Sequence, residues 1–109
     1  MPHIRFRALQ SQQVRQLSQE LSPVLASAIQ TSEDNFTFEL IQTQFFSQGQ
    51  ETTSYPFVEV LWFARSQDVQ DRCALIITEK VKTLTKAEDV VVVFSTLEKT
   101  AYYENGKHF

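Results

Sequence analysis

Apolar residues recur along the chain with two different periods, and each period occurs twice. In residues 3–9 apolar and polar side chains alternate, which predicts a half-buried strand. From Ser11, the expected N-cap, apolar residues then recur every three or four positions, as in an amphipathic helix. These positions are Val14, Leu17, Leu21, Val24, Leu25 and Ala28. Residues 36–46 predict a long second strand, so the first half of the chain is expected to form strand, helix and strand.

The second half repeats this order after a polar segment, residues 47–54, that is expected to form a loop. Residues 55–65 are almost continuously apolar and predict a third strand. Ser66 is the expected N-cap of a second helix, and the apolar stripe of this helix is Val69, Cys73, Ile76, Ile77, Val81 and Leu84. Residues 90–94 form a run rich in β-branched side chains, which predicts a central strand buried on both faces.

Two consecutive strand–helix–strand units predict an α+β fold in a single domain of 109 residues. The units span about residues 2–46 and 55–97. The tail, residues 98–109, is expected to form a short strand or hairpin because Asn105-Gly106 favours a tight turn. The strands of such a unit are parallel when they share a sheet, and the crossover is right-handed. The prediction is therefore a four-stranded mixed sheet with both helices on one face.

The sheet face without helices combines apolar and charged positions. Its expected charged residues are Arg5, Arg7, Glu39 and Glu59. An apolar surface that carries opposite charges suits a subunit interface in which the ions are paired. The pattern therefore predicts an oligomer with salt bridges between these arginines and glutamates. The alternative is that the two arginines line a ligand pocket.

Composition and charge exclude several classes of protein. The net charge is −3 and no basic stripe exists, which argues against nucleic-acid binding. No segment approaches the roughly 20 apolar residues of a membrane-spanning helix. Arg5 and Arg7 interrupt the region where a secretion signal would need an apolar core. Cys73 is the only cysteine, so an internal disulfide is excluded, and its position on the helical stripe predicts a core residue. We expect a cytoplasmic protein.

No metal site or cofactor is expected. His3 and His108 are too few for a metal site without a clear carboxylate partner. The sequence has neither a glycine-rich phosphate loop nor a nucleophile elbow. His108 can titrate near neutral pH, but its position near the end of the sequence favours a solvent-facing or interface residue.

The two ends of the sequence and the order of its elements resemble a known family. A chain that begins Met-Pro and contains two βαβ units in about this length resembles the tautomerase superfamily, which includes macrophage migration inhibitory factor and the 4-oxalocrotonate tautomerases. More narrowly, the opening MPHIRFR and the closing TAYYENGKHF resemble an uncharacterised bacterial family with a tautomerase-like fold. The resemblance covers the whole chain. It implies a homotrimer and keto–enol tautomerisation of a small 2-oxo acid.

The resemblance also implies a catalytic role for Pro2. Once Met1 is removed, the ring nitrogen of Pro2 is a secondary amine that can act as a general base. Burial near cations would favour its neutral form, whereas an ordinary α-amino group titrates near pH ~8. The alternative is that Pro2 only begins an edge strand.

Three further residues are candidates for substrate binding. The resemblance implies that Arg65 holds the carboxylate of the substrate, beside the helix that begins at Ser66. Tyr102 and Tyr103 are candidates for the pocket wall. The alternatives are that Arg65 pairs with Asp68 on the surface and that at least one tyrosine lies in a subunit interface.

The sequence departs from the cytokine-like members of the superfamily. Those members have a lysine before the second strand, whereas residues 31–35 contain no cation. They also have tyrosine and asparagine in the last core strand, at the places of Val91 and Val93. These differences argue against an aromatic 2-oxo acid as substrate and against a cytokine role. Two functions remain: a tautomerase that uses Pro2, or a non-catalytic module, either a ferredoxin-like small-molecule-binding domain or an oligomeric assembly subunit.

Overall fold

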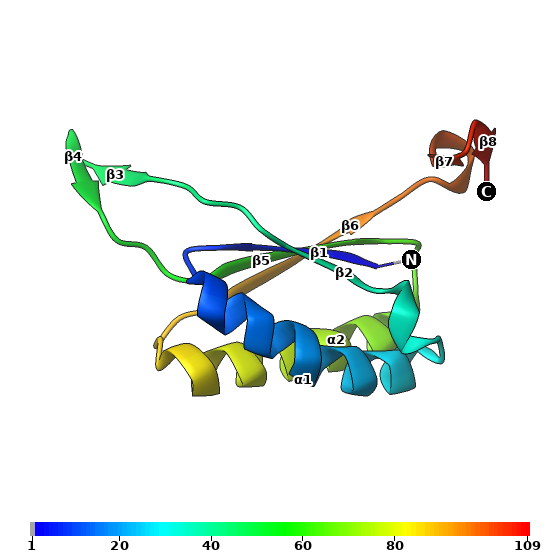
Figure 1. Cartoon of the computed structure of the whole chain (residues 1–109), viewed down its shortest axis with the longest axis horizontal. Coiled ribbons are helices and arrows are strands. Elements are labelled where there is room, and N and C mark those ends of the chain that lie inside the picture. Colours follow the sequence, from blue (N-terminus) through cyan, green and yellow to red (C-terminus); the bar gives the residue numbers. More distant parts are fainter. Residues whose placement is uncertain (1) are drawn as a thin grey trace.

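A four-stranded mixed sheet with two helices on one face forms the body of the protein (Figure 1). The computed structural model describes residues 2–109. The strands, in their order across the sheet, are β2 (Thr37–Leu40), β1 (His3–Arg7), β5 (Phe57–Trp62) and β6 (Val91–Thr96). The helices are α1 (Ser11–Ile29) and α2 (Gln67–Thr85). The predicted α+β architecture is confirmed. No helix within residues 2–109 is long and apolar enough to cross a membrane.

The two halves of the sheet are built alike. The pairs β1–β2 and β5–β6 are parallel, and β1 joins the halves through an antiparallel pairing with β5. His3 faces Thr37 in the first half and Phe57 faces Val91 in the second, so paired residues lie 34 positions apart in each half. The two strands of each βαβ unit are therefore direct neighbours. A ferredoxin-like fold separates them by another strand, so the ferredoxin-like part of the alternative is wrong.

The core lies between the sheet and the helices. The sheet contributes Ile4, Phe6, Val58, Val60 and Trp62, and α2 contributes Cys73, Ile77 and Val81. The buried residues of α1 are Val14, Leu17, Leu21, Leu25, Ala26 and Ile29. Both predicted helical stripes thus face the core, except that Val24 of the α1 stripe is 37% exposed and Ala26 and Ile29, which the prediction did not include, are buried.

The two helices begin close to the predicted positions. The side-chain oxygen of Ser66 accepts a hydrogen bond from the backbone N–H of Val69 at 3.3 Å, which confirms Ser66 as the N-cap of α2. In α1 the N-cap is Gln10 instead of Ser11. Its backbone N–H donates to the side-chain oxygen of Gln13 at 2.8 Å. The Gln13 side chain therefore satisfies the N–H of the N-cap residue itself, whereas a serine hydroxyl at the N-cap accepts from an N–H of the first helical turn.

The predicted second strand, residues 36–46, is wrong in its length. β2 ends at Leu40, where its pairing with β1 ends: the last pair is Phe6 with Leu40, β1 itself continues only to Arg7, and the N–H of Ile41 still donates to the carbonyl of Phe6 at 2.9 Å. Beyond that point no strand offers a partner. The chain leaves the sheet and forms a separate hairpin of β3 (Phe45–Ser47) and β4 (Gln50–Thr52). Part of the expected loop is therefore strand.

The predicted central strand at residues 90–94 is also wrong in its placement. β6 is an edge strand of the sheet, and Val93 is 39% exposed. The two interior strands are β1 and β5, since these strands join the two halves. An unbroken run of β-branched residues predicts a strand, but it does not fix the position of that strand in the sheet.

The predicted C-terminal hairpin is confirmed. β7 (Tyr103–Glu104) and β8 (Lys107–His108) pair antiparallel, and Asn105 and Gly106 adopt the positive φ values of 54° and 85° that a tight turn requires. Short 3-10 turns at Glu33–Asn35 and Lys99–Ala101 precede β2 and β7. Both hairpins project from the sheet on the side away from the helices (Figure 1).

Candidate functional site

The start of β1 and the ends of β5 and β6 lie together where these strands begin or end. We call this end of the sheet, which runs across the strands, the terminal edge. The parallel strands β5 and β6 end there with the pair Trp62–Thr96. β1 begins there, with His3 opposite Leu61, and one more step in this register brings Pro2 opposite Trp62. Pro2 is buried, and its carbonyl accepts a hydrogen bond from the N–H of Thr37 at 3.1 Å.

Arg65 follows β5 at this edge and is held in place by its neighbours. Its Nη1 donates to the carbonyl oxygen of Phe63 at 2.8 Å, and its guanidinium carbon lies 5.6 Å from the centre of the Trp62 ring. Its side chain forms no ion pair within 4.0 Å among residues 2–109, with Asp68 or any other carboxylate. The guanidinium group is therefore fixed in position, and its charge is not neutralised.

A cleft of about 610 Å³, which we call the terminal cleft, opens at the ends of β5 and β6. It is lined by Phe63, Ala64, Arg65, Thr96, Leu97, Glu98, Lys99 and Thr100. The volume suits a small molecule, and crevices outside the carboxyl ends of parallel strands are common ligand sites. Sequence reasoning had found Arg65 but missed Lys99. The only signal for Lys99 was its place shortly after the last strand of the sheet.

Arg65 also lines a second cleft, on the helical side of the sheet. This cleft of about 410 Å³ lies between the end of α1 and the start of α2, and Arg72 lines it as well. Arg65 thus stands between two cavities.

The two candidate tyrosines occupy different environments. Tyr102 lines a pocket of about 340 Å³ with His3, Arg5, Thr37, Leu61 and Leu97. Its ring packs edge-on against Phe63, with 5.1 Å between ring centres. Tyr103 is 63% exposed on β7, contacts the ring of His108 at 5.8 Å, and lines neither this pocket nor the terminal cleft. Pro2, Arg65 and Tyr102 thus all lie near the terminal edge, but Arg65 and Tyr102 line different cavities, Pro2 lines neither of them, and Tyr103 lies outside both.

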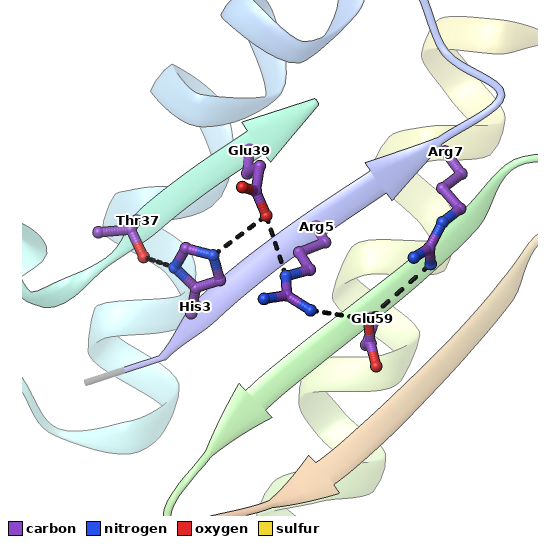
Figure 2. Close-up of polar contacts among 6 residues, drawn as sticks. All are labelled: His3, Arg5, Arg7, Thr37, Glu39 and Glu59. Atoms are coloured by element: carbon purple, nitrogen blue, oxygen red, sulfur yellow. Dashed lines mark hydrogen bonds and ion pairs between the residues drawn. The ribbon is translucent and has the colours of Figure 1, made fainter. Parts of the chain in front are cut away.

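The arginines and glutamates of the helix-free face form ion pairs within one chain (Figure 2), and their place in a subunit interface stays a prediction. Arg5 lies between two glutamates, with its Nε 2.9 Å from Glu39 and its Nη1 3.6 Å from Glu59. Arg7 approaches Glu59 at 3.8 Å. His3 extends the row, since its ring contacts the hydroxyl of Thr37 and lies 3.3 Å from Glu39. The charges on this face are thus largely neutralised before any partner binds.

The effect of His3 and Arg5 on Glu39 should be measurable in the titration of Glu39. The hydrogen bond from His3, together with the charges of His3 and Arg5, lowers the pKa of Glu39 below its ordinary value. A carboxyl with a lowered pKa in the folded state stabilises the fold above its unfolded pKa of about 4.3, and this contribution is lost as pH falls through the folded value. We expect His3→Ala to raise the pKa of Glu39, as measured by NMR titration of its carboxyl carbon. Arg7→Ala, which removes a partner of Glu59 only, should leave the pKa of Glu39 lowered. Equal pKa shifts of Glu39 in the two variants would contradict the role of His3.

Two further groups complete the chemistry of the described residues. Cys73 lies on the buried face of α2, and burial raises the pKa of its thiol, which keeps it protonated. Within residues 2–109, no three His, Cys, Asp or Glu side chains gather where they could hold a metal ion.

Distant solved structures share this fold. A fused 4-OT described as an asymmetric trimer is 14% identical with a TM-score of 0.83, covering 97% of this chain and 94% of the other. Pt0534 inactivated by 2-oxo-3-pentynoate is 15% identical with a TM-score of 0.78, covering 98% and 94%. The fold is therefore tautomerase-like, as predicted. No curated protein matches the sequence significantly.

Two solved structures are much more similar in sequence. A protein of unknown function from Vibrio cholerae O1 biovar eltor is 46% identical with a TM-score of 0.89, covering 99% of this chain and 87% of the other. A domain of unknown function (DUF1904) from Sebaldella termitidis is 39% identical with a TM-score of 0.94, and both chains are covered completely. The family model of this domain matches residues 1–108. The chain therefore belongs to the DUF1904 family, a family of domains of unknown function.

Proposed function

We propose that this protein is a tautomerase-type enzyme that moves a proton on a small 2-oxo acid, with Pro2 as the general base. The observation that carries the proposal is that buried Pro2 shares the terminal edge with Arg65, whose charge has no carboxylate partner within residues 2–109. Proton abstraction beside a ketone needs a base and a group that stabilises the developing negative charge. The terminal cleft supplies room for a small substrate next to Arg65.

In this mechanism the nitrogen of Pro2 takes a proton from C3 of the substrate. The electrons of the C–H bond form an enolate, and Arg65 holds the substrate carboxylate through its planar guanidinium group. The proton returns to a different atom to complete the tautomerisation. The nitrogen has a lone pair for this step only after Met1 is removed, because in the Met-Pro bond it belongs to an amide. Burial near a cation favours the neutral form of an amine.

The comparisons support the substrate class. Pt0534, which has the same fold, is inactivated by a 2-oxo acid. The fused 4-OT shares the fold as well. We favour a non-aromatic 2-oxo acid, because residues 31–35 and the positions of Val91 and Val93 lack the polar groups of the cytokine-like members.

The proposal is tested by two measurements on the purified protein. Intact mass reports whether Met1 is removed. Incubation with 2-oxobutanoate in D₂O then reports proton transfer, since exchange at C3 removes the C3 proton signal from the NMR spectrum. We expect a processed chain and exchange that scales with protein concentration. Retention of Met1, or exchange no faster than in heat-denatured protein, would overturn the proposal.

A specific observation favours the alternative of a non-catalytic assembly subunit. Pro56 occupies the position of Pro2 in the second half: it is buried before β5, and its carbonyl accepts from the N–H of Val91 at 3.1 Å. Pro56 lies within the chain and cannot have a free amine. A proline at this position therefore has a structural use in the absence of catalysis, and a processed protein without exchange activity would support this function.

We also propose that the protein is a homotrimer that assembles through its helix-free face. The paired charges of Figure 2 allow this face to be buried without new ionic partners. Both hairpins project on the same side (Figure 1). The fused 4-OT with this fold is described as a trimer.

The assembly is tested by placing a charge on that face. Val93 points there from β6 and is 39% exposed. Val93→Glu would bury an unpaired carboxylate in the interface, which costs several kcal/mol, so we expect the variant to be monomeric by light scattering while the parent protein has three times the chain mass. Leu75→Glu, on the exposed face of α2 with Leu75 59% exposed, is the matched control. A trimeric Val93→Glu variant would contradict the proposed interface.

A further inference from the structure

The terminal cleft contains a second cation that the proposed chemistry does not use. Lys99 lines the cleft together with Arg65. Its Nζ lies 5.9 Å from the centre of the Phe63 ring, while Arg65 donates to the carbonyl oxygen of the same Phe63 at 2.8 Å. Both cations therefore lie near one residue of the cleft, and Arg65 is also hydrogen-bonded to it.

The backbone around Lys99 is firmly attached. The N–H of Leu97 donates to the carbonyl of Trp62 at 2.7 Å, which ties this segment to the end of β5. Lys99 begins a 3-10 turn, and its own carbonyl accepts from the N–H of Tyr102 at 3.2 Å. The ring of Tyr102 in turn packs against Phe63. A ligand that binds the ammonium group thus needs to order only the lysine side chain, which limits the entropic cost of binding.

Neither cation of the cleft is neutralised. Among residues 2–109, Lys99 forms no ion pair within 4.0 Å, and the same holds for Arg65. Glu98 also lines the cleft but pairs with neither cation. The lining therefore has more positive than negative charge, although the whole chain has a net charge of −3. Such a cleft attracts anions.

We infer that Lys99 is a second anion-binding residue and that the ligand of the terminal cleft carries two acidic groups, one for Arg65 and one for Lys99. The planar guanidinium of Arg65 suits a carboxylate, and the ammonium of Lys99 accepts an anionic group of any shape. The inference rests on the proposed function only in the role of Arg65 as holder of the first carboxylate. It requires no catalysis by Pro2.

The test uses the fluorescence of Trp62, the only tryptophan of the chain. The guanidinium of Arg65 lies over its ring, so a carboxylate bound to Arg65 should change the emission. Straight-chain dicarboxylates from malonate to adipate are titrated beside monocarboxylates of equal length. We expect the best dicarboxylate to bind about three- to fivefold more tightly than its monocarboxylate, as for one exposed ion pair. This preference should weaken as salt is added.

Variants assign the preference to Lys99. Lys99→Met should remove it by weakening the dicarboxylates more than the monocarboxylates, while Lys82→Met, which removes an exposed charge from α2 away from the cleft, should retain it. Glu98→Gln should tighten the binding of both ligand classes. Equal affinity for both classes, or a preference that survives in Lys99→Met, would overturn the role of Lys99 and leave the proposed function standing. If no carboxylate changes the emission or binds by calorimetry, the role of Arg65 in the proposed function falls as well.

Discussion

Replacing Phe6 with alanine is expected to lower the free energy of unfolding by about 3–5 kcal/mol. Phe6 is fully buried between the sheet and the helices, and its ring lies against that of Phe38 with 6.4 Å between centres. β1 has strands on both sides, so its backbone cannot move to fill the cavity that the substitution leaves. The loss is a large share of the total of about 5–15 kcal/mol that is usual for proteins.

Phe46→Ala is the matched control for this prediction. It removes the same atoms from β3, where Phe46 is 65% exposed. For the unassembled chain, the expected change in the free energy of unfolding is within about 0.5 kcal/mol. Urea denaturation at one fixed protein concentration measures both variants, because assembly would make stability depend on concentration. Similar losses in the two variants would contradict the placement of the core.

Periodicity predicted the fold because each element has one buried face. The alternation of β1 and the stripe of α2 led to the residues that are buried, such as Ile4, Phe6 and Ile77. Where an element ends and where it sits in the sheet depend on partners distant in sequence. β2 ends at Leu40, where its pairing with β1 ends, and no pattern within residues 36–46 reports the length of β1. The edge position of β6 likewise depends on its pairing with β5, a strand distant in sequence.

The candidate site was predictable only where a family resemblance or a regular pattern pointed to it. Pro2 and Arg65 came from the resemblance, and the ion pairs of Arg5 and Arg7 came from strand alternation. Lys99 had neither signal. Its place in the cleft results from the parallel pairing of β5 with β6, which brings the segments after both strands together. A contact between segments more than 30 residues apart appears only once the sheet has formed.

Pro2→Ala is expected to lower the rate of proton exchange by about 100-fold, the low end of what a positioned general base contributes. The low end applies because removal of Met1 from the variant still leaves a primary amine at the same point of the chain. The ring that holds the nitrogen in place is lost, whereas the carbonyl that bonds the N–H of Thr37 remains. The initial rate of C3 exchange in D₂O measures the change.

Pro56→Ala separates catalysis from folding in this experiment. Pro2 and Pro56 are both buried, both precede a strand, and each carbonyl accepts a backbone hydrogen bond at 3.1 Å from the first residue of the neighbouring parallel strand. Loss of either ring should therefore cost a similar amount of stability, which urea denaturation will report. Only Pro2 can have a free nitrogen. A large loss of exchange in Pro2→Ala with near-normal exchange in Pro56→Ala would assign the rate to that nitrogen, and equal rates in the two variants would leave both prolines with a purely structural role.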